Sequence, residues 1–173
     1  MIIWLIGLSG AGKTTIGRRA YEIWKVEAPN TVFVDGDEIR DIFKHDQRPD
    51  AHAVEGRRAN AERITELCAW LDRQDINVVC CILSIFPEMR RANRTRFSSY
   101  FEAYVSVPME VLRKRDIKDL YAPALAGDKP NVVGVDIPFP EPTDSDLVID
   151  NSAEGTDPDA QARHLLRSAG VLP

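Results

Sequence analysis

A glycine-rich segment near the N-terminus has the residue types and spacing of a phosphate-binding loop. Residues 7–14 read Gly-Leu-Ser-Gly-Ala-Gly-Lys-Thr, which matches G-x-x-x-x-G-K-[ST] at every fixed position. Glycines let the backbone wrap around phosphate oxygens, while successive amide groups and the start of a following helix point at the negative charge. We expect Lys13 to reach the β and γ phosphates of ATP and the Thr14 hydroxyl to bind magnesium.

Two carboxylates follow the second apolar run of the chain. Asp35 and Asp37 come directly after a Val-Phe-Val segment, with Gly36 between them. Ligands of parallel α/β sheets bind at the carboxyl ends of the strands, so both side chains should face the phosphate loop. One carboxylate could orient or deprotonate an acceptor hydroxyl, and the other could hold magnesium, for which we favour Asp35 beside Thr14. The alternative is an acidic turn that caps the next helix, which Asp37 could also do.

The elements that must position these residues are short buried strands alternating with helices. Residues 1–6 form a continuous apolar run, which is typical of a strand buried on both faces of a parallel sheet. Further β-branched runs, separated by segments with helical potential, occur at residues 31–34, 76–83, 104–107 and 147–149. This alternation predicts a three-layer α/β fold of the P-loop type, with a mostly parallel sheet of about five strands.

Two longer segments complete the predicted fold. The longest helix is expected at residues 55–73, where Ile64, Cys68 and Leu71 lie on one helical face. Residues 123–142 hold five of the eleven prolines, so they cannot form a long regular element. A long irregular segment in a compact domain is usually a binding loop. We therefore predict a flexible lid at about residues 116–142 that closes over both ligands and excludes water.

Composition limits the remaining possibilities. A chain of 173 residues can bury one full core, so we expect a single domain over residues 1–173. Twenty-two Lys and Arg against 27 Asp and Glu give a net charge of −5, which argues against nucleic-acid binding. The apolar run at residues 1–8 is too short to span a membrane and lacks the features of a signal peptide. Three cysteines without metal-ligand spacing suit a reducing cytoplasm.

The phosphate loop indicates the class of cofactor and leaves the reaction open. A GTPase would need a guanine-reading N/T-K-x-D element, and the sequence contains no such string. A small-molecule kinase, an ATPase module coupled to a partner and a nucleotide-binding regulator remain. The carboxylate pair favours the kinase, with ATP and Mg²⁺ as cofactors and a small-molecule acceptor.

Six short motifs between about residues 2 and 150 resemble, in order, those of one enzyme family. Residues 7–15 resemble G-L-S-G-[SA]-G-K-[ST]-T, and residues 35–40 resemble D-G-D-x-x-R. Residues 55–64, 83–84, 115–121 and 134–138 are similar to E-D-R-x-x-N-x-R-R-I, I-S-P, R-D-x-K-G-L-Y and G-I-D-x-P. This set is similar to the adenylylsulfate kinase family, whose members use ATP to phosphorylate the ribose 3′-hydroxyl of adenosine 5′-phosphosulfate.

The resemblance implies a role for each matching residue. It implies that ATP is bound by Gly7, Ser9, Gly10, Ala11, Gly12, Lys13, Thr14, Thr15 and Arg115. It implies that a nucleotide acceptor is bound by Arg40, His52, Arg57, Asn60, Ser84, Lys118 and Val132. Lys13, Asp35 and Asp37 are the expected catalytic residues, and the family also suggests a homodimer. For Arg57 and Asn60 the alternative is a solvated helix surface, and for Arg90, Arg91, Arg94 and Arg96 we favour a solvated or salt-bridged helix face.

Two departures from the family pattern concern the acceptor base. His52 and Val132 stand where the family has two phenylalanines that sandwich the adenine. The lysines after G-L-Y are replaced by Ala122 and Pro123, and Asp119 replaces the glycine. A related branch phosphorylates cytidine diphosphoramidate, and a cytidine diphosphoramidate-type acceptor is our leading prediction. One alternative is a genuine adenylylsulfate kinase, in which Phe43, Phe86 or Phe139 would rebuild the adenine clamp. The other is a non-catalytic or partner-stimulated ATP-binding module.

Overall fold

The structure, a computed structural model of the chain, describes residues 1–116 and 119–173. Its strands are β1 (Ile2–Ile6), β2 (Thr31–Asp35), β3 (Asn77–Ile82), β4 (Tyr100–Ser106) and β5 (Leu147–Asp150). Its helices are α1 (Lys13–Glu27), α2 (Gly36–Ile42), α3 (Val54–Asp72), α4 (Pro87–Arg96), α5 (Met109–Arg115), α6 (Tyr121–Ala126) and α7 (Pro158–Ser168), with a short 3₁₀ helix at His45–Gln47.

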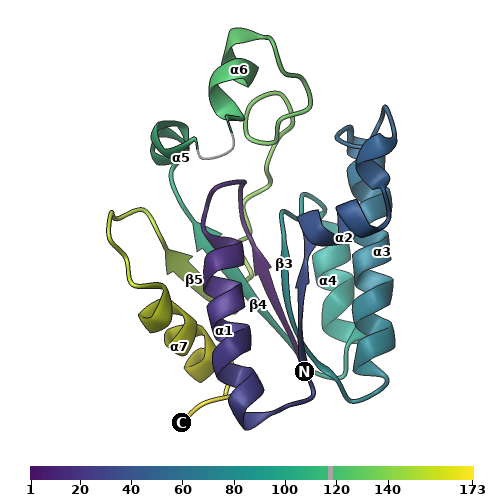
Figure 1. Cartoon of the computed structure of the whole chain (residues 1–173), viewed down its shortest axis with the longest axis vertical. Coiled ribbons are helices and arrows are strands. Elements are labelled where there is room, and N and C mark those ends of the chain that lie inside the picture. Colours follow the sequence, from purple (N-terminus) through teal and green to yellow (C-terminus); the bar gives the residue numbers. More distant parts are fainter. Residues whose placement is uncertain (117–118) are drawn as a thin grey trace.

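The strands form one parallel sheet in the order β2-β3-β1-β4-β5 (Figure 1). β1 lies in the centre and pairs with β3 on one side and β4 on the other. Every residue of β1 is at most 2% exposed, which explains why its sequence is a continuous apolar run rather than an alternating one. The predicted P-loop type of α/β fold with five parallel strands is confirmed.

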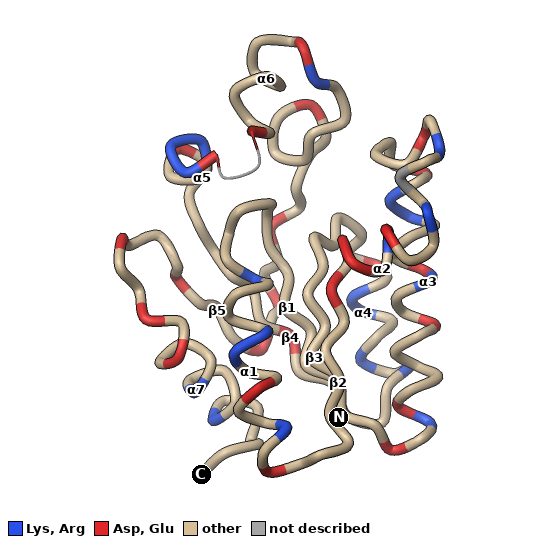
Figure 2. The backbone as a smooth tube through the Cα atoms, viewed as in Figure 1, with Lys and Arg blue, Asp and Glu red and all other residues tan. Residues whose placement is uncertain are grey.

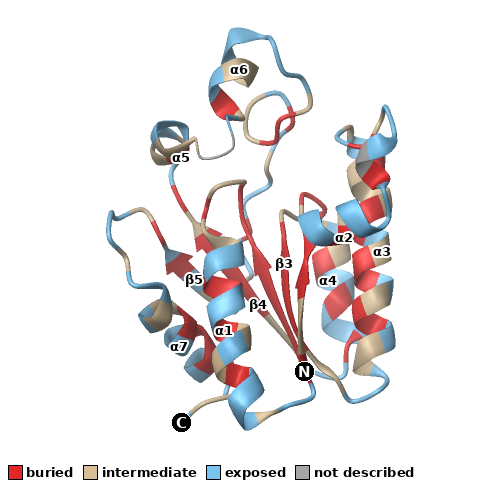
Figure 3. Cartoon of the chain, viewed as in Figure 1, coloured by how far each residue is buried: buried red, intermediate tan, exposed pale blue. Residues whose placement is uncertain are grey.

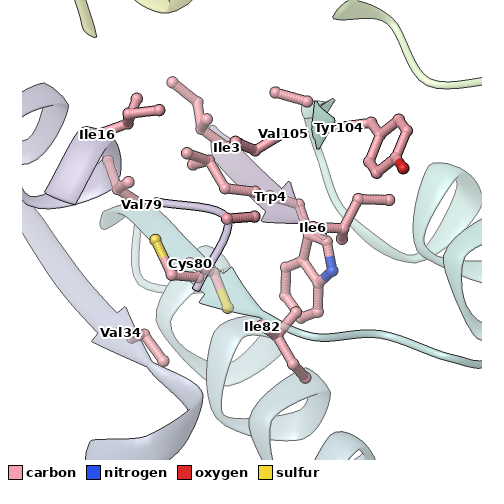
Figure 4. Packing of buried hydrophobic residues seen from close by; sticks show 14 of the residues in the cluster. Ile3, Trp4, Ile6, Ile16, Val34, Val79, Cys80, Ile82, Tyr104 and Val105 are labelled. Atoms are coloured by element: carbon pink, nitrogen blue, oxygen red, sulfur yellow. The ribbon is translucent and has the colours of Figure 1, made fainter. Parts of the chain in front are cut away.

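Helices cover both faces of the sheet. α1 and α7 lie together on one face, and α3 and α4 cover the other (Figure 1). Figure 4 shows Ile3 and Val79 on the side of Ile16 in α1, whereas Trp4 and Ile82 belong to the opposite side. Figure 3 shows that the strands form the buried layer between these helices. The resulting core fixes the carboxyl ends of the strands, where the phosphate loop begins.

The boundaries of β4 differ from the prediction. The strand begins at Tyr100, whereas the sequence pattern predicted residues 104–107. The reason is Glu102, a charged residue in the middle of the strand that is only 1% exposed. Its carboxylate accepts hydrogen bonds from the Tyr100 and Ser145 hydroxyls at 2.8 Å each. These partners satisfy the buried charge and let a strand continue where hydropathy alone ends it.

The lid segment, which we define as the described part of the predicted lid at residues 116 and 119–142, lies above the carboxyl ends of the strands (Figure 1). Among the described residues of this segment, the only helix is α6, which has six residues. The prediction that the segment contains no long regular element is therefore confirmed. The Asp116 carboxylate caps α6 by accepting from the amides of Leu120, Tyr121 and Ala122. These bonds lower the pKa of Asp116. Whether the lid moves stays a prediction.

Three smaller sequence expectations can be compared with the structure. Cys68, Cys80 and Cys81 are all free and buried. Arg94 and Arg96 pair with Asp146 and Glu66, as expected for a salt-bridged helix face, but Arg90 is buried at 5% exposure, so the expectation was wrong there. Within the part of the chain that the structure describes, none of the helices has the length and apolar character to cross a membrane.

Candidate active site

A cavity of about 520 Å³ opens at the carboxyl ends of β1, β2 and β3, below the lid segment. It brings together most of the residues predicted from the sequence, namely Ser9, Gly10, Gly12, Lys13, Thr14, Thr15, Asp35, Asp37, Arg40, His52, Arg57, Asn60 and Ser84. The first six come from the phosphate loop and α1, and the others from β2, α2, α3, the loop before α3 that holds His52, and the segment after β3. One cavity therefore joins the predicted phosphate and acceptor sites.

The phosphate loop joins β1 to α1, as its motif requires. Gly10 and Gly12 have φ angles of +77° and +99°, a left-handed conformation that favours glycine. The Lys13 ammonium group donates to the Leu8 carbonyl at 2.8 Å, which places it against the loop. At the start of α1 the first backbone amides have no partner within the helix, so they are available to an anion.

Thr14 and Asp35 meet on the cavity wall. The Thr14 hydroxyl donates to Asp35 Oδ2 at 2.7 Å. The other carboxylate oxygen, Oδ1, accepts from the Asp37 amide at 2.9 Å, so Asp35 rather than Asp37 caps α2. Capping and a place in the site are therefore compatible, since Asp35 does both. Asp37 is 63% exposed, and its carboxylate lies 3.4 Å from Arg40 Nη2.

The side of the cavity predicted to bind the acceptor carries two guanidinium groups, those of Arg40 and Arg57. Arg57 donates to the backbone carbonyls of His52 and Asn131, each at 2.8 Å, and so connects α3 to the lid segment. Burial, together with the positive charge of Arg40, lowers the pKa of Arg57. Two cations close enough to repel each other favour an anion between or beside them. This part of the wall thus suits a phosphate-bearing acceptor.

Asn60 and Ser84 complete the polar part of this wall. Asn60 is 3% exposed; its amide Nδ2 lies 3.4 Å from the Gly36 carbonyl, and its Oδ1 atom has no partner among the described residues. Such a buried acceptor atom on a cavity wall can take a hydrogen bond from a ligand. Ser84 has a φ of +48°, an uncommon conformation for a residue other than glycine. Backbone strain of this kind is often found at functional sites.

Several predicted residues do not line the cavity. Gly7 and Ala11 belong to the phosphate loop, but both are buried and neither lines the cavity. Arg115 donates to the carbonyls of Asn151 and Ser152, at 2.9 and 3.1 Å, and lies in the basic last turn of α5 (Figure 2). Val132 is 2% exposed, and its neighbour Val133 lines the cavity instead. Lys118 lies outside the described residues.

The cavity also contains residues that sequence reasoning missed. These are mainly apolar: Ala61, Ile82, Leu83, Ile85, Leu120 and Val133. Of the three phenylalanines that could rebuild an adenine clamp, Phe86 lines the cavity, and the Arg58 guanidinium lies 4.2 Å from its ring centroid. Phe43, by contrast, is 55% exposed, and Phe139 packs against Tyr104.

Comparisons with known proteins agree with this geometry. A family model described as adenylylsulphate kinase matches residues 1–150. The chain belongs to the adenylylsulphate kinase family. It is accordingly an ATP-dependent phosphotransferase. Two relatives are a cytidine diphosphoramidate kinase from Campylobacter jejuni, 42% identical over 87% of this chain and 86% of that protein, and an adenylyl-sulfate kinase from Halothermothrix orenii, 34% identical over 88% and 80%.

A solved structure also resembles this member of the adenylylsulphate kinase family. The Mycobacterium tuberculosis APS kinase CysC, in complex with AMPPNP and APS, superposes with a TM-score of 0.83 at 25% identity. The match covers 98% of this chain and 96% of that one. In that protein the shared fold therefore accommodates an ATP analogue and a nucleotide acceptor together.

Proposed function

We propose that this kinase transfers the γ-phosphate of ATP to the ribose 3′-hydroxyl of a cytidine diphosphate-type acceptor, with cytidine diphosphoramidate as the leading candidate. The residues on the side of the cavity predicted to bind the acceptor carry the proposal. His52 is exposed on this side, and aliphatic Val133 lines it beside buried Val132, where an adenine clamp would need two rings. The 42% identity to the cytidine diphosphoramidate kinase, against 34% to an adenylyl-sulfate kinase, supports the same acceptor.

The residues on the donor side fit ATP and Mg²⁺. The Thr14 hydroxyl and the Asp35 carboxylate offer two hard oxygen ligands 2.7 Å apart on the cavity wall. Mg²⁺ prefers such oxygens and takes its other ligands from phosphates and water, so a larger cluster of protein ligands is not needed. When bound, Mg²⁺ neutralises charge on the β and γ phosphates. Lys13 adds positive charge at the same phosphates, and the loop amides hold them in place.

The two carboxylates have different surroundings, and we assign them different roles. Asp35 already accepts from Thr14 and from the Asp37 amide, so it belongs to the metal side. Asp37 is exposed to the cavity and is assigned to the acceptor hydroxyl, which it orients and from which it accepts the proton. Arg40 lies beside it and, with Arg57, faces the acceptor phosphates.

A specific observation favours the second candidate, a genuine adenylylsulfate kinase. Phe86 lines the cavity, and one aromatic ring can stack on an adenine. Stacking on an aromatic side chain contributes about 1 to 3 kcal/mol per base, so the loss of two clamp rings costs more than one remaining ring restores. A pyrimidine has less surface to stack and loses less. The third candidate, a non-catalytic ATP-binding module, predicts ATP binding without transfer.

Side-by-side kinetics test the proposal. The kcat/KM for cytidine diphosphoramidate should exceed that for adenylylsulfate, and ADP release without acceptor should be slow. His52→Phe should narrow the difference between the two kcat/KM values. It should raise kcat/KM for adenylylsulfate by about fivefold or more if one stacking contact returns. Efficient use of adenylylsulfate with no use of the cytidine compound would refute the proposed acceptor. No transfer to either compound would favour the ATP-binding module.

A cytoplasmic location and a homodimer complete the proposal. The free, buried cysteines and the use of ATP support the location. The homodimer rests on the family resemblance alone. Sedimentation of the purified chain measures its oligomeric state.

A further inference from the structure

Two side chains from distant parts of the chain contact the phosphate loop outside the cavity. The Tyr121 hydroxyl, at the start of α6, donates to the Ser9 carbonyl at 2.8 Å. The Asn151 amide, directly after β5, donates to the Ala11 carbonyl at 2.8 Å. Among the described residues, neither Tyr121 nor Asn151 lines the cavity. They therefore act on the loop without reaching the space where the phosphates bind.

The geometry of the peptide bond gives these contacts a consequence for phosphate binding. A trans peptide is planar, so the carbonyl of one residue and the amide N–H of the next point in opposite directions. When Tyr121 holds the Ser9 carbonyl, the Gly10 amide points in the opposite direction. When Asn151 holds the Ala11 carbonyl, the same applies to the Gly12 amide. Gly10 and Gly12 both line the cavity. Because glycine rotates freely, these two peptide planes need an external anchor to keep one orientation.

Asn151 is firmly oriented for this task. It is 9% exposed, and its Oδ1 atom accepts from the Thr156 hydroxyl at 2.7 Å and from Gln161 Nε2 at 3.0 Å. With both donors on the oxygen, the amide nitrogen must face Ala11. A Cβ atom on Gly12 would collide with this nitrogen, so a glycine is required where the anchor meets the loop.

The Tyr121 hydroxyl is buried and keeps the proton that it donates. The residue is 2% exposed, and burial, with a smaller effect from Asp116, raises the pKa of its hydroxyl to about 12. The hydroxyl therefore keeps its proton at neutral pH. Because Tyr121 begins α6, its bond to Ser9 also links the lid segment to the phosphate loop.

We propose that Tyr121 and Asn151 are positioning residues that orient the Gly10 and Gly12 amides toward the ATP phosphates. Tyr121 does so from the lid segment, and Asn151 from the loop after β5. Arg115, directly before the lid segment, donates to the carbonyls of Asn151 and Ser152 and so helps to hold Asn151 in place. Nucleotide affinity should therefore depend on both side chains to the extent that the nucleotide carries β and γ phosphates.

Calorimetric titration of two variants with AMPPNP, ADP and AMP, in the presence of Mg²⁺, tests the proposal. Tyr121→Phe removes one oxygen, and Asn151→Asp replaces the donor by an acceptor of the same shape. Each substitution should lower the affinity for AMPPNP and for ADP about 3- to 10-fold, which is the effect of one lost hydrogen bond. The affinity for AMP should change by less than about twofold. The matched controls are Tyr104→Phe and Asn30→Asp. In the parent protein the Tyr104 hydroxyl donates to Glu141, and the Asn30 amide donates to the Asp75 carbonyl. Both should leave all three affinities unchanged.

Two results would overturn the proposal. If the affinity for AMPPNP stayed within about twofold of the parent in both variants, Tyr121 and Asn151 would not matter for phosphate binding. If the affinity for AMP fell as much as that for AMPPNP, the substitutions would cause a general structural defect. Thermal melts establish that each protein is folded. If Asn151→Asp does not fold, Tyr121→Phe decides alone. The titrations contain no acceptor, so they are independent of the proposed acceptor.

Discussion

Replacing Thr14 by valine removes one hydroxyl from the phosphate loop and keeps the shape of the side chain. In the structure that hydroxyl donates to Asp35 at 2.7 Å, and Asp35 is only 6% exposed. A hydrogen bond to a charged group contributes about 1.5 to 3 kcal/mol. Because Asp35 keeps its bond from the Asp37 amide and Thr14 is open to solvent, we expect the free energy of unfolding to fall by about 1 to 2 kcal/mol. For a chain of this size that lowers the Tm by about 2 to 8 °C.

The larger effect of Thr14→Val is expected on catalysis. Loss of one contact that stabilises transition-state charge typically costs about 100-fold or more in kcat. If Thr14 is a magnesium ligand, the Mg²⁺ concentration that gives half-maximal activity should also rise about tenfold or more. Initial rates of ADP formation, measured over a MgCl₂ series at saturating ATP and acceptor, give both quantities.

Thr31→Val is the matched control for this experiment. Thr31 is 1% exposed, and its hydroxyl donates to the Ala28 carbonyl at 2.6 Å, at the opposite end of β2 from the site. It should lose a comparable amount of stability while its Mg²⁺ dependence stays unchanged. If Thr14→Val showed the same unchanged Mg²⁺ dependence, Thr14 would serve only to hold Asp35, and our assignment of the metal site would be wrong.

Three further predictions concern the loop and the lid. Lys13→Ala should lower kcat about 100-fold or more, because it removes positive charge at the β and γ phosphates; near-normal turnover would contradict the phosphate site. Limited proteolysis should cut the segment at residues 116–142 in the free protein and be suppressed by AMPPNP plus acceptor, whereas cleavage unaffected by ligands would argue against gating. Because amide hydrogen bonds lower the pKa of Asp116 below 3.8, its stabilising effect is present above that pH and is lost as the pH falls through the lower folded value. Lid cleavage by an acid-active protease should therefore accelerate on acidification in the parent and show a weaker pH dependence in Asp116→Asn.

The sequence was most informative where function requires a local pattern. The phosphate loop, the Asp35 and Asp37 pair and the strand-helix alternation are all short-range signals. The alternation forms the parallel sheet, and the structure brings the loop and the two carboxylates into one cavity. β4 was shortened in the prediction because Glu102 interrupts its apolar pattern. Its buried charge is satisfied by Tyr100 and by Ser145, which is 43 residues away in sequence.

Contacts that depend on strand order could not be predicted in the same way. Asn151 reaches Ala11 across 140 residues because β5 lies beside β4 and β4 beside β1. The same limitation applies to irregular loops, where no periodicity fixes which of two neighbours faces a ligand. Val133 rather than Val132 lines the cavity for this reason.

The bridge that Arg57 forms between α3 and the lid segment has an implication for how this family can diversify. The phosphate loop belongs to the β1–α1 connection, whereas His52 and Val133 come from two other segments that Arg57 joins through the backbone carbonyls of His52 and Asn131. Backbone carbonyls are present whatever the side chain, so residues at positions 52 and 133 can be exchanged without losing the bridge. Under the proposed function, acceptor preference can therefore change through substitutions at positions 52 and 133 while the phosphate loop stays constant.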